Sequence, residues 1–218
     1  MKHAEPDLTR HGDGGCSPTD AAPPRVATAA DVPALSAALA AAFVDDPVFS
    51  WLIPARGRRR ARLRRFFELE LRYVVLPKGR LWCSARSSGA SLELAPGAWR
   101  MPLTTQLVHG PGFTRVFGAR LPHALTLITL MDQRHISEPH YYIAYVGVAP
   151  EAQGHGFGTR LLQPTLDRCD REGLPAYLEA TSARNRALYE RLGFEVQGEL
   201  RVGGSPPLWP MRRPPTRP

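Results

Sequence analysis

The spacing of apolar side chains predicts an alternation of strands and helices. Tyr141–Val148 (YYIAYVGV) carries no charge and is rich in β-branched and aromatic residues, which is typical of a short strand buried on both faces. Ala176–Ala180 predicts a second strand, and Arg80–Ala85 with Ser91–Leu94 predicts a hairpin across a turn-rich loop. Shorter strands are expected at Arg25–Ala27, Phe194–Arg201 and Leu208–Met211.

Other segments place apolar residues at helical spacing. The expected helices run from an N-cap at Asp31 to about Phe43, over Arg58–Leu76, from Ala119 to about Arg134, from Thr159 to Glu172 with Gly173 as terminator, and over Asn185–Leu192 with Gly193 at its end. Strands that alternate with helices indicate an α/β fold. Pro and Gly interrupt Pro96–Gly118, and this segment shows no clear period. Residues 1–24 are polar and rich in Gly and Pro, so we expect a disordered leader.

A glycine loop joins the Tyr141–Val148 strand to the helix that follows it. Its residues are Gln153, Gly154, His155, Gly156, Phe157, Gly158 and Thr159. Glycines let successive backbone N–H groups point to one place, and the first turn of a helix adds unpaired donors and a positive dipole end. The loop therefore predicts a phosphate site. It matches neither the dinucleotide fingerprint, because Thr159 stands where a third glycine is needed, nor a P-loop.

The pattern Val148-x-Pro150-x-x-Gln153-Gly154-x-Gly156-x-Gly158 resembles the acetyl-CoA motif of the GCN5-related N-acetyltransferases (GNAT). The later segments 178–181 (LEAT) and 188–194 (LYERLGF) resemble the second motif of that family. Glu138-Pro139 before the strand and Trp209-x-Met211 near the end resemble its puromycin N-acetyltransferase-like branch.

The resemblance implies a central mixed, mostly antiparallel sheet with helices on both faces and acetyl-CoA in a splay between central strands. It implies one N-acetyltransferase domain over residues 25–213, with 214–218 as a flexible tail. The expected reaction is direct acetyl transfer to the primary amine of a small molecule, with an antibiotic or aminonucleoside as the sharper hypothesis. A protein lysine or N-terminal acetyltransferase, or a non-catalytic acyl-CoA- or nucleic-acid-binding regulatory protein, are the alternatives.

The resemblance also assigns roles near the donor. Backbone groups of Val146, Gly147 and Val148 are expected to contact acetyl-CoA together with the glycine loop, where His155 serves through its amide. Tyr189 is the expected proton donor to the CoA thiolate. At its helical spacing Tyr189 could instead be a core residue, and Asn185 either binds acetyl-CoA or caps its helix.

The acceptor side is defined less sharply by the sequence. Asp46 and Trp51 fall in a region that lies beside the acceptor pocket in the resembled fold, although Trp51 could simply pack its helix down. Tyr142 and Glu179 are further expected substrate contacts. The candidates for the general base are Glu93, Glu138, His140, Tyr142, Glu179 and Asp46, and an ordinary network role is open for each.

Composition narrows the class of protein without changing the expected fold and reaction. The chain has 218 residues with 43% hydrophobic and 22% charged residues, typical of a globular domain. No apolar run approaches a membrane span, no signal peptide is visible, and three scattered cysteines show no metal spacing, so we expect a cytoplasmic monomer or homodimer without a metal. The net charge of +8 suits an anionic donor such as CoA. Many arginines lie in 56–65, but no recognised nucleic-acid module accompanies them, so we expect a solvated face.

Overall fold

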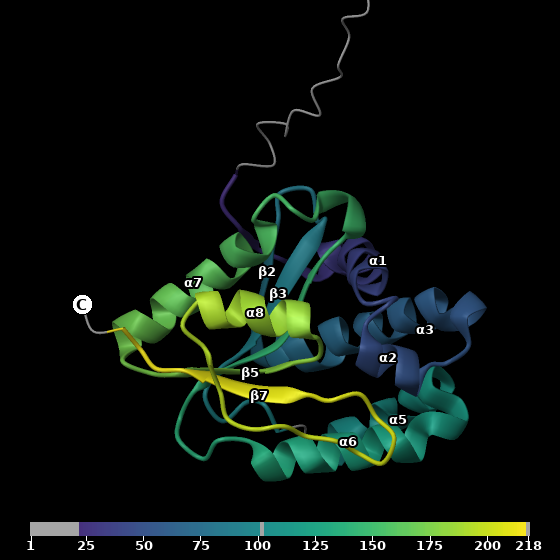
Figure 1. Cartoon of the computed structure of the whole chain (residues 1–218). Helices are drawn as coiled ribbons and strands as arrows, with labels where there is room; N and C mark the ends of the chain where they lie inside the picture. The colour runs from purple at the N-terminus through teal and green to yellow at the C-terminus, as the bar shows by residue number, and fades with distance from the viewer. Residues whose placement is uncertain (1–21, 101–102, 217–218) are drawn as a thin grey trace, which may run out of the picture.

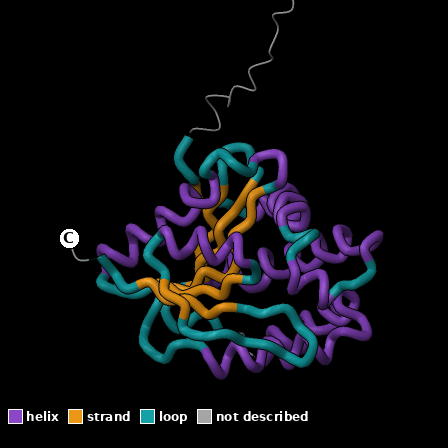
Figure 2. Tube along the Cα trace, in the orientation of Figure 1, coloured by secondary structure: helices purple, strands orange, loops and turns teal. Residues whose placement is uncertain are grey.

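The computed structural model describes residues 22–100 and 103–216. Its centre is a seven-stranded sheet in the order β1-β2-β3-β4-β5-β7-β6 (Figure 2). Every neighbouring pair is antiparallel except β4 and β5, which are parallel, so the expected mixed, mostly antiparallel sheet is confirmed. The strands are β1 (Arg25–Val26), β2 (Gly79–Cys83), β3 (Gly89–Leu94), β4 (Tyr141–Val148), β5 (Ala176–Ala180), β6 (Glu195–Val196) and β7 (Trp209–Arg213).

Helices cover both faces of this sheet (Figure 1). α7 (Phe157–Glu172) and α8 (Ala183–Arg191) enclose one core with β4 and β5, in which Ile143, Leu162 and Leu178 are buried. α1 (Val32–Ala42), α2 (Pro47–Leu52) and α3 (Arg56–Leu69) enclose the other, larger core. α5 (Leu103–Phe117) and α6 (Leu121–Arg134) extend the second layer, so the segment without a clear period is largely helical.

The middle of the sheet opens between β4 and β5. Their ladder pairs Tyr141 with Ala176 and Tyr142 with Tyr177, and β4 then continues to Val148 without further pairing to β5. On its other edge β4 stays paired with β3 throughout, interrupted by a β-bulge at Ala144. The bulge turns Tyr142 and Tyr145 toward the same face of the sheet. The splay expected from the family resemblance is therefore present.

Several helix boundaries differ from the sequence-based expectation. The helix expected over Arg58–Leu76 begins at Arg56 and changes at Glu70 to a π-helix (Glu70–Val75) that leads into α4 (Leu76–Lys78). Arg59 does not point outward with its neighbours: it is buried and donates to the carbonyl oxygens of Ile53 at 2.7 Å and Val44 at 2.9 Å. Buried backbone carbonyls need donors, and a guanidinium supplies several.

The part of the chain after β5 brings two further corrections. The strand expected over Phe194–Arg201 is reduced to β6 and one isolated bridge between Leu200 and Leu208. The capping residue of α8 is Ser182, whose Oγ accepts from the Asn185 N–H at 3.2 Å, so Asn185 does not cap its own helix. The expected disordered leader lies outside the described residues except for 22–24, and the last two residues of the tail also lie outside them.

Candidate active site

The glycine loop forms the entrance to α7. The Gln153 side chain donates to the Val148 carbonyl oxygen at 2.9 Å and fixes the turn to the end of β4. Gly154 and Gly156 have φ of +85° and +73°, in the left-handed region that favours glycine, and Gly156 occupies the N-cap of α7. The helix begins at Phe157, so the N–H groups of its first turn face the loop.

The positive character of the loop is increased by a side chain. Arg160 donates to the carbonyl oxygen of His155 at 2.9 Å, and its guanidinium lies 4.8 Å from the centre of the Phe157 ring. His155 itself is exposed, which agrees with a role through its backbone. Left-handed glycines, first-turn N–H groups and a guanidinium together fit the phosphates of acetyl-CoA.

The open edge of β4 continues the site from the loop into the splay. Val146, Gly147 and Val148 lie beyond the last pairing with β5, so β5 does not pair with them on the edge that faces it. Gly147 is required for a reason that the sequence does not show. A Cβ there would lie 2.8 Å from Leu39 and 2.9 Å from Phe43, so glycine lets α1 pack against β4.

Tyr189 stands on the β5 side of the splay. It is 6% exposed, and its hydroxyl has no hydrogen-bond partner among the described residues. Burial, followed by the charge of Asp46, raises the pKa of Tyr189 well above its usual value. A neutral hydroxyl without a protein partner suits a proton donor. Asn185 lies half-buried on the same helix.

Asp46 connects the two sides of the molecule. One carboxylate oxygen accepts from the N–H groups of Val48 and Phe49 at 2.9 and 3.0 Å and so caps α2, and the other accepts from the hydroxyl of Thr181, directly after β5. Burial raises the pKa of Asp46. Because both oxygens are occupied, we assign Asp46 to holding α2 against β5 rather than to contacting a substrate.

Tyr142 and Glu179 form the polar part of the acceptor face. The Tyr142 hydroxyl donates to Glu179 Oε2 at 2.9 Å, and the Glu179 side chain is only 3% exposed. Burial raises the pKa of Glu179 to about 7. Its Oε1 and the nearby Tyr177 hydroxyl have no hydrogen-bond partner within the described part of the chain. Unpaired buried polar atoms are rare and indicate a place for a ligand or water.

An aromatic wall continues from this carboxylate. The Tyr145 ring lies 5.4 Å from Phe67, 5.8 Å from Phe66 and 6.4 Å from Phe49. A second carboxyl, that of the half-buried Glu70 on the π-helix, has its pKa raised to about 7 by desolvation, and its charge acts on Tyr145. Acidic and aromatic groups in one cluster favour a cationic amine.

Two predicted catalytic carboxylates lie outside this cluster. Glu93 is buried against α7, where it accepts from Thr165 at 2.8 Å and Arg168 at 3.1 Å, and also from Trp82. Glu138 is half exposed and pairs with Arg212 at 2.6 Å. Both carboxylates are engaged by donors away from the splay, so we give neither a part in the reaction.

Trp51 also lies apart from the acceptor carboxylate. Its indole packs edge-on against His123 of α6, with ring centroids 5.4 Å apart, and Arg120 lies 6.0 Å from the ring. This placement agrees with the alternative that Trp51 packs its helix down, which the sequence left open. Sequence reasoning missed Tyr145, Glu70, Tyr177 and His135, because only the bulge, the π-helix and the fold bring them together.

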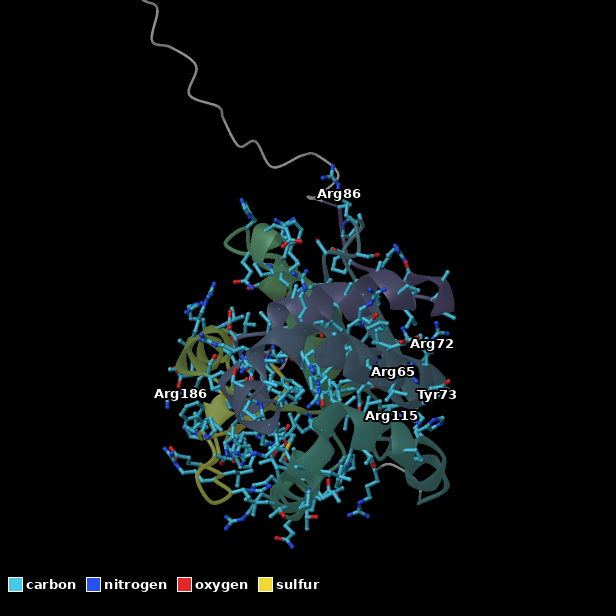
Figure 3. The ribbon with its side chains drawn as sticks, turned by 90° about the vertical axis from the view of Figure 1, so that its right-hand side faces the viewer. Arg65, Arg72, Tyr73, Arg86, Arg115 and Arg186 are labelled. Atoms are coloured by element: carbon cyan, nitrogen blue, oxygen red, sulfur yellow. The ribbon has the colours of Figure 1, made fainter. Side chains whose placement is uncertain are left out.

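The arginines of α3 form a separate surface. Arg58, Arg62 and Arg65 line, with Arg115 of α5, an open groove of about 360 Å³, which we call the arginine groove. Figure 3 shows Arg65 and Arg115 close together on this side, far from Arg186 of α8. The groove is distant in the chain from the glycine loop, and its Arg65 pairs with Glu68 at 3.3 Å.

Within residues 22–100 and 103–216, no group of three or more His, Cys, Asp or Glu is placed to hold a metal ion. None of the helices among these residues is both long and apolar enough to cross a membrane. Cys83 and Cys169 are buried free thiols.

Comparisons with known proteins place these features in a family context. The model of the acetyltransferase (GNAT) family matches residues 122–194, from α6 through α8. A Schizosaccharomyces pombe protein described as an uncharacterized N-acetyltransferase is 32% identical over 185 residues, which are 79% of this chain and 74% of that protein. A Corynebacterium glutamicum crystal structure described as histone acetyltransferase HPA2 and related acetyltransferase is 29% identical with a TM-score of 0.67, covering 90% of this chain and 99% of that one. The Drosophila melanogaster polyamine N-acetyltransferase shares the fold at 15% identity, with a TM-score of 0.56 and coverage of 88% and 98%.

Proposed function

This chain belongs to the acetyltransferase (GNAT) family, and from that premise we propose that it transfers the acetyl group of acetyl-CoA to a primary amine of a small molecule. Members of the family are acyltransferases that generally take acetyl-CoA as the donor. The glycine loop, the first turn of α7 and the open edge of β4 fit that donor's phosphates and pantetheine chain.

The observation that carries the choice of acceptor is the buried Glu179 carboxylate, with Tyr142 bound to it and Tyr145 beside it. A carboxylate inside an aromatic enclosure attracts and orients a cation that is small enough to enter. The fold neighbour from Drosophila acts on polyamines, which also carry primary amines. An aminonucleoside or another antibiotic amine is the sharper form of the proposal, based on the puromycin N-acetyltransferase-like motifs.

In the proposed reaction the neutral amine nitrogen attacks the thioester carbonyl carbon, the carbon–sulfur bond breaks, and the thiolate receives a proton from Tyr189. The proton that the nitrogen loses on becoming an amide restores the Tyr189 hydroxyl. The Tyr189 hydroxyl is available for this because no described protein group holds it. Positioning of the amine and proton transfer are the contributions expected from the protein.

A protein acetyltransferase is the second candidate, because the Corynebacterium structure is described as a histone acetyltransferase. The test is CoA thiol release from acetyl-CoA across aminonucleosides, aminoglycosides, polyamines and lysine peptides. Tyr189→Phe should lower kcat about 100-fold on the preferred amine. Tyr73→Phe, a matched change at an exposed tyrosine stacked on His109, should leave kcat unchanged. Turnover confined to lysine peptides would refute the small-molecule proposal.

A further inference from the structure

A buried row of side chains runs behind Glu179. The His140 Nδ1 lies 2.7 Å from the Glu138 carbonyl oxygen, and the His140 Nε2 lies 2.8 Å from His135 Nε2. The other ring nitrogen of His135, Nδ1, faces Glu179 Oε1 at 3.9 Å. The side chains of His135 and Glu179 are each 3% exposed, and His140 is 2% exposed.

The backbone carbonyl sets the proton positions along this row. A carbonyl oxygen only accepts, so His140 Nδ1 carries the hydrogen and donates it. Burial lowers the pKa of His140, so its ring is neutral near pH 7 and its Nε2 is an acceptor. His135 must then donate from Nε2. Burial and the neighbouring His140 lower the pKa of His135 to about 3, so its Nδ1 carries no hydrogen.

Glu179 Oε1 is therefore faced by a bare nitrogen rather than by a donor. The tautomer of His135 that could donate to it is blocked, because it would turn the lone pair of His140 Nδ1 against the Glu138 carbonyl. Oε2 accepts from the neutral Tyr142 hydroxyl at 2.9 Å, and the Tyr177 hydroxyl is near enough to lower the pKa of Glu179 without forming a hydrogen bond of normal geometry. The other polar and aromatic groups around the row are Trp99, Arg100, Asp132, Tyr145 and Tyr177. A carboxylate with so little donation is a stronger base than an exposed one.

We propose that Glu179 is the proton acceptor of the reaction, reached through Tyr142, and that His135 and His140 are positioning residues that keep it basic. The assignment rests on the proposed function. The acceptor enters as an ammonium ion, and its proton passes to the Tyr142 oxygen while the Tyr142 proton passes to Glu179 Oε2. The result is a neutral amine, an unchanged tyrosine and a protonated Glu179. The proton returns to solvent by the same path after the product leaves.

The first experiment compares the pH dependence of kcat with one acceptor in wild type, His140→Phe and the double variant His135→Phe/His140→Phe. Without His140, the His135 ring can place its hydrogen on Nδ1 and donate to Glu179. The acid limb of kcat should then move about one pH unit lower, the size expected for a hydrogen bond to a charged group. The double variant has no such donor, so the shift of the acid limb of kcat to lower pH should disappear. The acceptor's own titration is common to all variants and cancels.

His109→Phe is the matched control, since His109 stacks on Tyr73 at 3.8 Å on α5, away from this row. His109→Phe should leave the acid limb of kcat at the same pH as in wild type. A merely structural role would lower the stability or kcat of His140→Phe without moving the limb, and that result overturns the assignment.

A measurement on the protein without substrate tests this inference independently of the proposed function. Long-range proton–nitrogen NMR should show hydrogen on His140 Nδ1 and His135 Nε2, and the Glu179 carboxyl carbon should titrate near pH 7 and about one unit lower in His140→Phe. The opposite tautomers, or a carboxyl titrating near 4.5, overturn the inference whatever the activity. The assigned tautomers without turnover of any amine would instead refute the proposed function.

Discussion

Replacing Glu179 by Gln should make the protein more stable while removing most of its activity. Burial raises the pKa of Glu179 from an ordinary value of 4.5 to about 7 in the folded chain. Below pH 4.5 the folded and the unfolded chain both hold this proton. Between pH 4.5 and 7 the folded chain holds a proton that the unfolded chain has released, so the free energy of unfolding falls as the pH rises.

The magnitude follows from the gap between the two pKa values. A gap of about 2.5 pH units at 1.36 kcal/mol per unit means that ionised Glu179 lowers the free energy of unfolding by about 3 kcal/mol above pH 7. Gln has the shape of the protonated acid. Its carbonyl can still accept from Tyr142, and its NH₂ group can donate toward the bare Nδ1 of His135.

The assay is urea unfolding of wild type and Glu179→Gln at pH 5, 6, 7 and 8. The variant's advantage should be small at pH 5 and grow to about 3 kcal/mol at pH 8, while its kcat falls about 100-fold. Glu190→Gln, at an exposed carboxylate paired with Arg186, is the matched control and should leave kcat unchanged. An equal advantage at pH 5 and pH 8, or a growing loss of stability with pH, would refute the assignment of a raised pKa to Glu179.

Three further predictions concern other parts of the molecule. Gly156→Ala should weaken acetyl-CoA binding, measured by calorimetry, and lower the free energy of unfolding in urea by about 1 kcal/mol, because the φ of Gly156 is +73°. The control Gly57→Ala, in open space on α3, should not destabilise the protein. Asp46→Ala should destabilise by about 2–4 kcal/mol in urea, because the α2 cap and the Thr181 partner are lost, and Asp46→Asn should retain most of the stability because its amide can still cap. Replacing the three α3 arginines of the arginine groove by Gln should leave amine turnover unchanged in the thiol assay; loss of a salt-sensitive nucleic-acid complex on the same change would instead support a regulatory role.

Local sequence was enough to predict the elements that form the proposed donor site. The charge-free run of β4, the glycine loop and the helix after it follow from apolar period and from the backbone freedom of glycine, both of which act over a few residues. The family resemblance carried this further, to the splay and to Tyr189, neither of which follows from periodicity alone.

The tertiary structure decided which acidic groups lie in the proposed acceptor site. Glu93 and Glu179 look alike in the sequence, since each occupies a strand between apolar neighbours. The direction of each strand face places Glu93 on Arg168 and Thr165 of α7, and Glu179 on Tyr142. Such differences depend on partners more than 30 residues away in the chain, as the separation of 72 positions from Glu93 to Thr165 illustrates.

The same reason explains the basic character proposed for Glu179. No pattern in residues 135–140 shows that one histidine ring will meet a backbone carbonyl and the other a carboxylate on β5. Sequence by itself determined the elements and the donor loop, because periodicity and glycine conformation are local properties. Burial, desolvation and the positions of protons were decided by packing, because they depend on what surrounds a group in space.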